Sequence, residues 1–214
     1  TVAISTARRA EVVDRIRAAC GEGRQAYWVC TLIEDSEQLE AQAAETTHAE
    51  LERTLQGISI SLIHGRMKPA EKQKVMQQFQ SGAISVLVAT TVNEVGVDVP
   101  NASLMIMENA ERLGLAQLHQ LRGRVGRGSL ASSCVLLYQP PLSAMARERL
   151  NALRETNDGF EIAQKDLKLR GPGELLGMLA EVQDVAGTML RKHAGACDRL
   201  IARWVGNSAR FADA

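Results

Sequence analysis

The sequence predicts an α/β domain whose sheet is mostly parallel and flanked by helices. Three continuous apolar runs, residues 25–33, 84–89 and 131–138, have the composition of strands buried on both faces, as parallel strands are. Segments with helical periodicity separate these runs, so helix and strand alternate along the chain. With 45% apolar and 23% charged residues, the chain has enough apolar material for a core.

Short signals place the individual elements. Gly21 and Gly23 end the first helix, Ser36 caps a long helix rich in alanine and glutamate, and Pro69 occupies the first turn of the next. Strands are expected at residues 2–4, 25–33, 58–63, 84–89, 104–107 and 131–138, with 58–63 also buried on both faces. Helices are expected at residues 8–20, 36–55, 69–79, 143–154 and 160–169.

Pro140 and Pro141 end the α/β domain, which gives three expected parts. Residues 1–141 form the domain itself and residues 142–180 a helical hairpin. Residues 181–214 carry no strand signal and are expected to be a helical tail.

Composition limits the cellular setting. The four cysteines are far apart and form no metal-binding spacing, which indicates free thiols in a reducing cytoplasm. No apolar run approaches membrane-spanning length, so no membrane partner is expected. The net charge is zero, but residues 34–52 are acidic while the arginine-rich stretch and residues 191–210 are basic. A neutral chain of this kind can still present a basic face to a polyanion.

The stretch from Gln117 to Gly128 has the most specific composition in the chain, with three arginines and three glycines in its last seven residues. Leucines and a histidine at near-helical spacing precede the arginines, so a helix is expected to carry them. Planar guanidinium groups on a glycine-rich backbone suit a closely approaching phosphate. A solvated turn of glycine and arginine is the alternative from these residues alone.

Polar clusters follow three of the expected strands, where ligands bind in parallel sheets. They comprise His64, Gly65 and Arg66; Thr90, Thr91, Asn93, Glu94, Gly96 and Asp98; and Glu108 and Asn109. The two threonines fit either a backbone phosphate or helix capping. Asp98 fits either a ribose hydroxyl or the capping of its own loop.

Several kinds of site are missing from the sequence. The chain has no G-x-x-x-x-G-K-[S/T] phosphate loop and no acidic pair suited to magnesium, so no metal ligands are expected. Its four histidines do not cluster at ligand or triad spacing, and no serine has a nucleophile-elbow context. The chain therefore offers arginines for a phosphate but nothing that cradles one alone.

Five ordered segments resemble the C-terminal motor domain of superfamily 2 helicases of the RecG type, whose fold is RecA-like. Residues 27–33 (YWVCTLI), 89–98 (ATTVNEVGVD) and 120–127 (QLRGRVGR) resemble helicase motifs IV, V and VI. Residues 62–72 resemble the segment before motif V. Residues 164–177 (QKDLKLRGPGELLG) resemble the translocation motif that RecG shares with the transcription-repair coupling factor Mfd. The resemblance covers residues 1–177 and fades after Gly177, and Asn93 replaces a usual aliphatic residue.

The resemblance implies a role for each matching residue. Arg127 is the expected arginine finger on the γ-phosphate, Arg124 contacts the same phosphates or the partner domain, and Gln120 links nucleotide state to domain closure. Gly96 and Asp98 lie at the ribose edge of the nucleotide. The residues expected at the DNA backbone are Thr90, Thr91, Gly65 and Arg66, and those expected in the coupling lever are Arg170, Gly171, Gly173 and Glu174.

The same resemblance implies the second motor domain of a DNA helicase that uses ATP to remodel branched DNA, in fork reversal and Holliday junction processing. ATP with Mg²⁺ is expected to bind mainly to a first motor domain that this chain lacks. The implied partners are branched or duplex DNA and that first RecA-like domain, and the implied state is a cytoplasmic monomer. The chain is expected to be a fragment and inactive alone. Two alternatives are a coupling-factor translocase and a non-catalytic fragment that binds DNA backbone or a partner.

Overall fold

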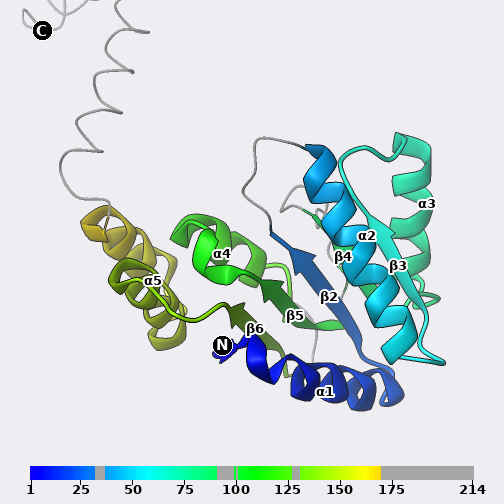
Figure 1. Ribbon diagram of the computed structural model, residues 1–214, viewed down its shortest axis with the longest axis horizontal. Coiled ribbons are helices and arrows are strands. Elements are labelled where there is room, and N and C mark those ends of the chain that lie inside the picture. Colours follow the sequence, from blue (N-terminus) through cyan, green and yellow to red (C-terminus); the bar gives the residue numbers. More distant parts are fainter. Residues whose placement is uncertain (32–36, 91–98, 100, 127–130, 170–214) are drawn as a thin grey trace, which may run out of the picture. The chain divides into compact units, whose positions relative to one another are not determined.

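The computed structural model describes residues 1–31, 37–90, 99, 101–126 and 131–169. The chain divides into two compact units, Thr1–Asp166 and Leu167–Ala214. The first unit holds all of the strands that the structure describes, and its architecture is shown in Figure 1.

The first unit is built on a six-stranded sheet in which every pairing is parallel. The strand order is β1-β6-β5-β2-β4-β3. The strands are β1 (Val2–Ser5), β2 (Gln25–Cys30), β3 (Ile60–Ile63), β4 (Val86–Ala89), β5 (Ala102–Glu108) and β6 (Ser133–Tyr138). The predicted parallel α/β fold is confirmed. Parallel strands must be joined by crossover connections, and this explains why helices and strands alternate along the sequence.

Helices cover both faces of the sheet (Figure 1). Buried residues of α1 (Arg9–Gly21) and α2 (Glu37–Thr54) form one apolar cluster with Trp28 on β2. The adjacent Tyr27 ring meets Phe79 of α3 (Pro69–Gln80), with 4.9 Å between ring centroids. Because neighbouring residues of a strand point to opposite faces, α3 covers the face opposite α1 and α2.

One remaining short helix follows β1, and the others follow β5 and β6. They are η1 (Thr6–Arg8), η2 (Ala110–Arg112), α4 (Leu115–Arg122), α5 (Ala144–Glu155) and a helix over residues 159–169. Helix α5 begins at the cap of Ser143, whose hydroxyl accepts from the backbone N–H of Ala146 at 3.1 Å. It contacts η2 and α4 and buries Leu150 and Leu153.

The structure corrects one expectation about the strands and resolves another. The strand predicted at residues 58–63 is not buried on both faces, because β3 lies at an edge of the sheet and Ile60, Ser61 and Leu62 are only half-buried. The isolated apolar run at residues 2–4 becomes β1 and pairs with β6 at the opposite edge, with Val2 beside Val135. None of the helices in the described part of the chain is long and apolar enough to cross a membrane.

Candidate functional site

The carboxyl ends of the six parallel strands lie along one edge of the sheet, where ligands bind in folds of this kind. Thr31 follows β2, His64 follows β3, Thr90 follows β4 and Asn109 follows β5. The described residues of the polar clusters that the sequence places after β3, β4 and β5 therefore share this edge.

The cluster after β4 is described only in part. Thr90 is buried, with 4% of its surface exposed. Thr91, Gly96 and Asp98 lie outside the described residues. The proposed contacts of these residues with DNA and with the nucleotide ribose stay predictions.

The loop after β3 presents an exposed arginine from a backbone held at two points. The N–H of Met67 donates to the carbonyl of His64 at 3.1 Å, which closes a tight turn. Lys72 Nζ, on the first turns of α3, donates to the carbonyl of Gly65 at 2.9 Å. Gly65 and Arg66 are both exposed. A phosphate could approach this loop closely, which suits the backbone contact expected of these two residues.

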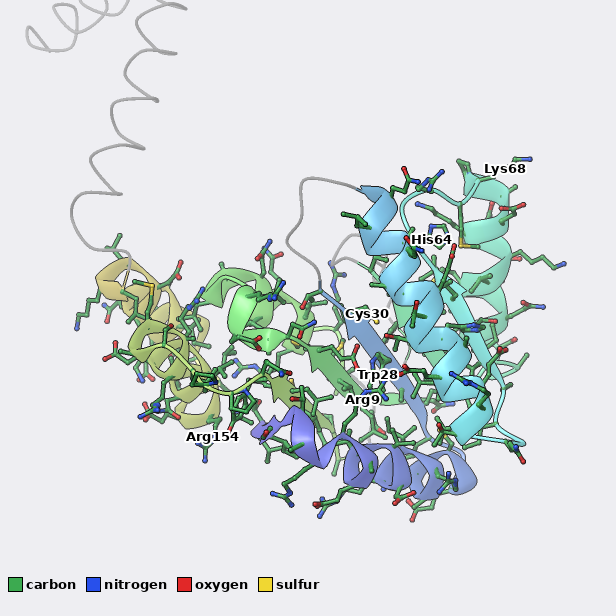
Figure 2. All side chains as sticks on the ribbon, viewed as in Figure 1. Arg9, Trp28, Cys30, His64, Lys68 and Arg154 are labelled. Atoms are coloured by element: carbon green, nitrogen blue, oxygen red, sulfur yellow. The ribbon has the colours of Figure 1, made fainter. Side chains whose placement is uncertain are left out.

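The end of β5 is held by charged and hydroxyl side chains rather than left open. Arg9 Nε donates to Glu108 Oε1 at 2.8 Å, and Thr47 Oγ1 donates to Glu108 Oε2 at 3.4 Å. The Thr31 hydroxyl donates to the Glu108 carbonyl. The Arg9 guanidinium also lies 5.0 Å from the centroid of the Trp28 ring, beside β2 (Figure 2). The Glu108 carboxylate thus joins α1, α2 and β5 and serves the fold.

The three cysteines in the described part of the chain do not form a reactive or metal-binding site. Cys20, Cys30 and Cys134 are free thiols, as expected. Burial raises the pKa of Cys20 and of Cys134 to about 11, and it raises the pKa of Cys30 further with help from the Glu108 carboxylate. These thiols therefore stay protonated at neutral pH. Across the part of the chain that is described, no group of His, Cys, Asp and Glu could hold a metal ion.

Helix α4 carries the first half of the arginine-rich stretch, as predicted. Leu115, Leu118 and Leu121 are fully buried and fix its orientation. The Gln117 side chain accepts from the backbone N–H of Gly114 at 3.1 Å and caps the helix N-terminus. Gln120 is exposed, so its side chain is available to a ligand or a partner.

Arg122 differs from its expected setting, because it serves the fold and not a phosphate. Its NH1 donates to the carbonyls of Leu153 at 3.1 Å and Thr156 at 2.8 Å, at the C-terminus of α5. Its NH2 contacts the carbonyl of Asn157 at 3.2 Å and His119 Nδ1 at 2.9 Å. Arginine compensates orphan carbonyls at a helix end in this way. Nothing in the sequence pairs Arg122 with carbonyls more than thirty residues away.

The rest of the stretch turns away from the helix. Arg124 is half-buried, and its backbone N–H donates to the carbonyl of Leu121 at 3.0 Å. Gly126 has φ of +84°, a conformation that strains other residues, so the glycine here is required by the backbone. Arg127 lies just beyond, outside the described residues. Gln120 and Arg124 are therefore brought to the same end of α4, whereas the finger itself is not described.

Two described helices precede the segment that is expected to be the lever. Helix α5 and residues 159–169 are joined at residues 156–158, where Asp158 Oδ1 accepts from the N–H of Phe160 at 2.7 Å. Arg170, Gly171, Gly173 and Glu174 lie outside the described residues, and so does the expected helical tail. The division of the chain at residues 141 and 180 stays a prediction.

Comparison with protein families gives two matches in chain order. A model described as "Helicase conserved C-terminal domain" matches residues 8–129, which is more than half of the chain. A model described as "ATP-dependent DNA helicase RecG, domain 3, C-terminal" matches residues 156–187.

Two curated relatives show how far the similarity extends. The ATP-dependent DNA helicase RecG of Escherichia coli K12 is 57% identical over 234 residues, which cover 100% of this chain and 34% of that protein. The Bacillus subtilis RecG is 46% identical over 172 residues, or 78% of this chain and 25% of that protein. This chain thus spans about a third of the length of such relatives. The alignment with the E. coli protein also exceeds the 214 residues of this chain, so the relative carries residues with no counterpart here.

Two solved structures are also similar to this chain. The structure of RecG bound to a three-way DNA junction matches with a TM-score of 0.67 and 42% identity, covering 80% of this chain and 22% of that one. The C-terminal domain of the DEAD-box protein Dbp5 matches with a TM-score of 0.50 and 17% identity, covering 72% of this chain and 89% of that domain, which supports the fold alone.

Proposed function

This chain belongs to the helicase conserved C-terminal domain family, in its RecG branch, and we propose that it is the second motor domain of an ATP-dependent DNA helicase that remodels branched DNA. In the whole protein, ATP binds between two RecA-like domains. Cycles of closure and opening move the protein along duplex DNA, so that forks are reversed and Holliday junctions are processed.

One observation carries this proposal. Identity of 57% with the E. coli RecG extends over the whole chain, including both the motor fold and the segment that the RecG-specific model matches. The alternative of a coupling-factor translocase is not favoured, because the relatives named above are RecG helicases.

The described geometry supports specific roles at the nucleotide. Gln120 and Arg124 sit at one end of α4, fixed by three buried leucines, and Arg127 follows within three residues of Arg124. We assign Arg127 to the γ-phosphate, Arg124 to the same phosphates or the partner domain, and Gln120 to sensing closure. Guanidinium groups fit a polyphosphate because they stay charged and bond in forks. Gly96 and Asp98 are assigned to the ribose edge.

DNA is assigned to the opposite part of the same edge. Exposed Arg66 on the fixed Gly65 loop would contact the backbone phosphates, and so would Thr91 after β4. The expected contact of Thr90 is not supported by its exposure of only 4%. Arg170, with Gly171, Gly173 and Glu174, would convert closure into movement. We further propose that residues 1–141 are the motor domain and that residues 142–180 are the coupling hairpin.

The chain needs a second domain for catalysis. Its sequence has no phosphate loop, so ATP and Mg²⁺ would be held mainly by a first motor domain, and the chain alone would be a non-catalytic fragment. The whole protein is proposed to act as a cytoplasmic monomer.

A chimera tests the function directly. This chain would replace the corresponding third of the E. coli K12 RecG, and ATP hydrolysis and unwinding of a synthetic fork would be measured. We expect DNA-stimulated hydrolysis in the range of phosphoryl-transfer enzymes, on the order of 1–100 per second, and fork unwinding. The remainder of the relative and this chain, each alone, are the controls and should be inactive. A folded chimera that binds ATP but shows no DNA-stimulated hydrolysis would argue against the proposal.

A further inference from the structure

The free edge of the sheet is a feature that the proposed function does not use. Among the described residues, strand β1 is the outermost strand of the sheet and pairs with β6 alone, so the backbone groups of alternate β1 residues point away from the described sheet. An edge strand of this kind is a template for another extended chain unless something covers it. Val2 of β1 is 48% exposed, and helix α5 contacts β1.

Two adjoining cavities lie beside β1 and share Val2, Ile4, Val12 and Arg15 in their walls. The larger one extends beneath α1 over β6 and β5, and the smaller one lies between β1, the start of α1 and Arg154. Their volumes are about 360 and 300 Å³. We call them together the β1 groove. The floor is apolar, made by β1 and by Val12 of α1.

The rim of the β1 groove is basic. Arg8 and Arg15 come from η1 and α1, and Arg154 comes from the last turn of α5, which Figure 2 shows close to the start of α1. Arg8 is neutralised locally, because its guanidinium donates to both carboxylate oxygens of Glu11 at 2.9 and 2.7 Å. Arg15 and Arg154 take part in none of the ion pairs among the described residues, and both are exposed.

We propose that the β1 groove is a docking site for an acidic, extended peptide segment of a partner protein, which adds to the sheet as a strand beside β1. Backbone hydrogen bonds to the free edge supply affinity, and apolar side chains of the segment lie on the floor of the groove. Carboxylates of the segment meet Arg15 and Arg154, and they make the site selective for acidic segments.

A peptide fits this site better than a nucleic acid does. The free N–H and C=O groups of a β strand alternate at a spacing that another backbone matches, and a phosphate chain offers no donors to the carbonyls. The apolar floor also gains from valine-like side chains, whereas a phosphate backbone would lose its hydration there.

The probe is an end-capped eight-residue peptide of the sequence V-E-E-V-V-E-E-V, which presents glutamate on both faces when extended. The full chain would be titrated with the labelled peptide and binding followed by fluorescence anisotropy. Hydrogen exchange would locate the site. We expect saturable binding that protects the amides of residues 2–5, with at least about tenfold weaker binding of a V-K-K-V-V-K-K-V peptide.

Two comparisons separate strand addition from plain charge attraction. Proline in place of the two central valines removes backbone donors, so binding should fall at least about tenfold although the charge is unchanged. The double charge reversal Arg15→Glu with Arg154→Glu should abolish binding. Its matched control, Arg112→Glu with Arg147→Glu, reverses two exposed arginines outside the groove and should bind normally. Thermal melting checks that both variants fold.

The proposal is overturned if the proline peptide binds as well as the parent or if the Arg15 and Arg154 reversal leaves binding unchanged. It is also overturned if no peptide binds while a 20-nucleotide single strand of DNA binds in a manner that the same reversal abolishes, which would make the groove a nucleic-acid site. If the same reversal instead changed only a concentration-dependent dimer seen by light scattering, the occupant would be a second copy of this chain.

Discussion

The guanidinium of Arg122 donates a hydrogen bond of 2.8 Å to the backbone carbonyl of Thr156. Thr156 follows the last residue of α5, while Arg122 ends α4, the helix that carries Gln120. A single side chain therefore ties the helix assigned to the nucleotide to the hairpin that leads to the proposed lever.

Replacing Arg122 should loosen this connection. Hydrogen bonds from a charged donor contribute about 1.5–3 kcal/mol each before solvent screening, so for this half-buried group we expect Arg122→Ala to lower the free energy of unfolding by about 2 kcal/mol. Arg122→Lys should recover less than half of the loss, because an ammonium cannot reach the carbonyls in a fork. Urea unfolding measures both values. Arg112→Ala, an exposed arginine in η2, is the control and should change little. An Arg122→Ala chain as stable as the parent would show that the contacts are energetically neutral.

The stability of the first unit should fall at mildly acidic pH because of His119. Burial, and after it the nearby Arg122 charge, lower the pKa of His119 below its ordinary value. Since a guanidinium only donates, His119 Nδ1 accepts and its proton sits on Nε2. Protonation of Nδ1 removes the hydrogen bond from Arg122, so His119 binds a proton more readily in the unfolded chain than in the folded one. Stability is therefore complete above the unfolded pKa near 6.5 and is lost as pH falls through the folded pKa.

The check on this pH effect is a comparison of unfolding free energies between pH 7.5 and pH 5. We expect the decrease to be smaller in His119→Gln, which keeps an acceptor but does not titrate. Every other residue is the same in the two proteins, so the comparison isolates His119. Parallel curves for parent and variant would assign the pH effect elsewhere.

The ion pair between Arg9 and Glu108 should matter more than the exposed pair between Arg8 and Glu11. The Glu108 side chain is only 15% exposed and accepts from Arg9 at 2.8 Å, whereas Glu11 is 57% exposed. We expect Glu108→Ala to cost about 1–3 kcal/mol, because it leaves Arg9 without its closest carboxylate, and Glu11→Ala to cost clearly less, because solvent screens the exposed pair. Guanidinium unfolding is unsuitable because the salt screens charges, so urea would be used. Equal losses in the two variants would contradict this ranking.

Catalysis depends on Arg127 if the arginine-finger assignment is correct. In the chimera with the first motor domain, we expect Arg127→Ala to retain nucleotide binding and to lower turnover by roughly a thousandfold or more. Arg127→Lys should recover little of it. Steady-state phosphate release and equilibrium binding of a labelled nucleotide measure the two effects separately. Near-normal turnover would move the finger to Arg124.

Coupling depends on Arg170 if the lever assignment is correct. In the same chimera, Arg170→Ala should preserve DNA-stimulated hydrolysis but reduce the base pairs unwound per ATP. If Arg170 only caps the preceding helix, the substitution should instead cost about 1 kcal/mol of stability and leave that ratio unchanged. Unwinding and hydrolysis measured on one fork substrate, with thermal melting alongside, distinguish the two.

The sequence predicts the layered parallel fold well, because burial on both faces and helical periodicity are local signals. It does not predict the position of a strand in the sheet, as residues 58–63 demonstrate. Their apolar composition matches that of a central strand, but β3 pairs only with β4 and stays half-exposed. Whether a strand lies at the edge or in the centre of a sheet depends on its pairing with segments that are distant in the sequence.

The site is predicted with the same limits. The pattern predicts helix α4, on which Gln120 is exposed, and the described residues of the polar clusters lie at the carboxyl edge of the sheet, while their roles stay predictions. The sequence pattern groups Arg122 with the arginines that suit a phosphate. An arginine beside a glycine has the same sequence pattern whether it binds a phosphate or a backbone carbonyl of its own fold. Only the packing of α5 against α4 shows that the partners of Arg122 are carbonyls. The Arg9–Glu108 ion pair also cannot be predicted from the sequence, because 99 residues separate its two members and only the fold brings them together.

The pairing of β1 with β6 has a consequence for how the protein is made. Val2 is synthesised long before Val135, its neighbour in the sheet. At about 5–20 residues per second, a ribosome takes roughly 7–27 s to translate the sequence between them. Through that interval β1 has no strand to join, and the nascent chain exposes an apolar segment with unpaired backbone groups. Long-range closure of this kind slows folding and favours aggregation, so the last step in completing the sheet falls after β6 has left the exit tunnel.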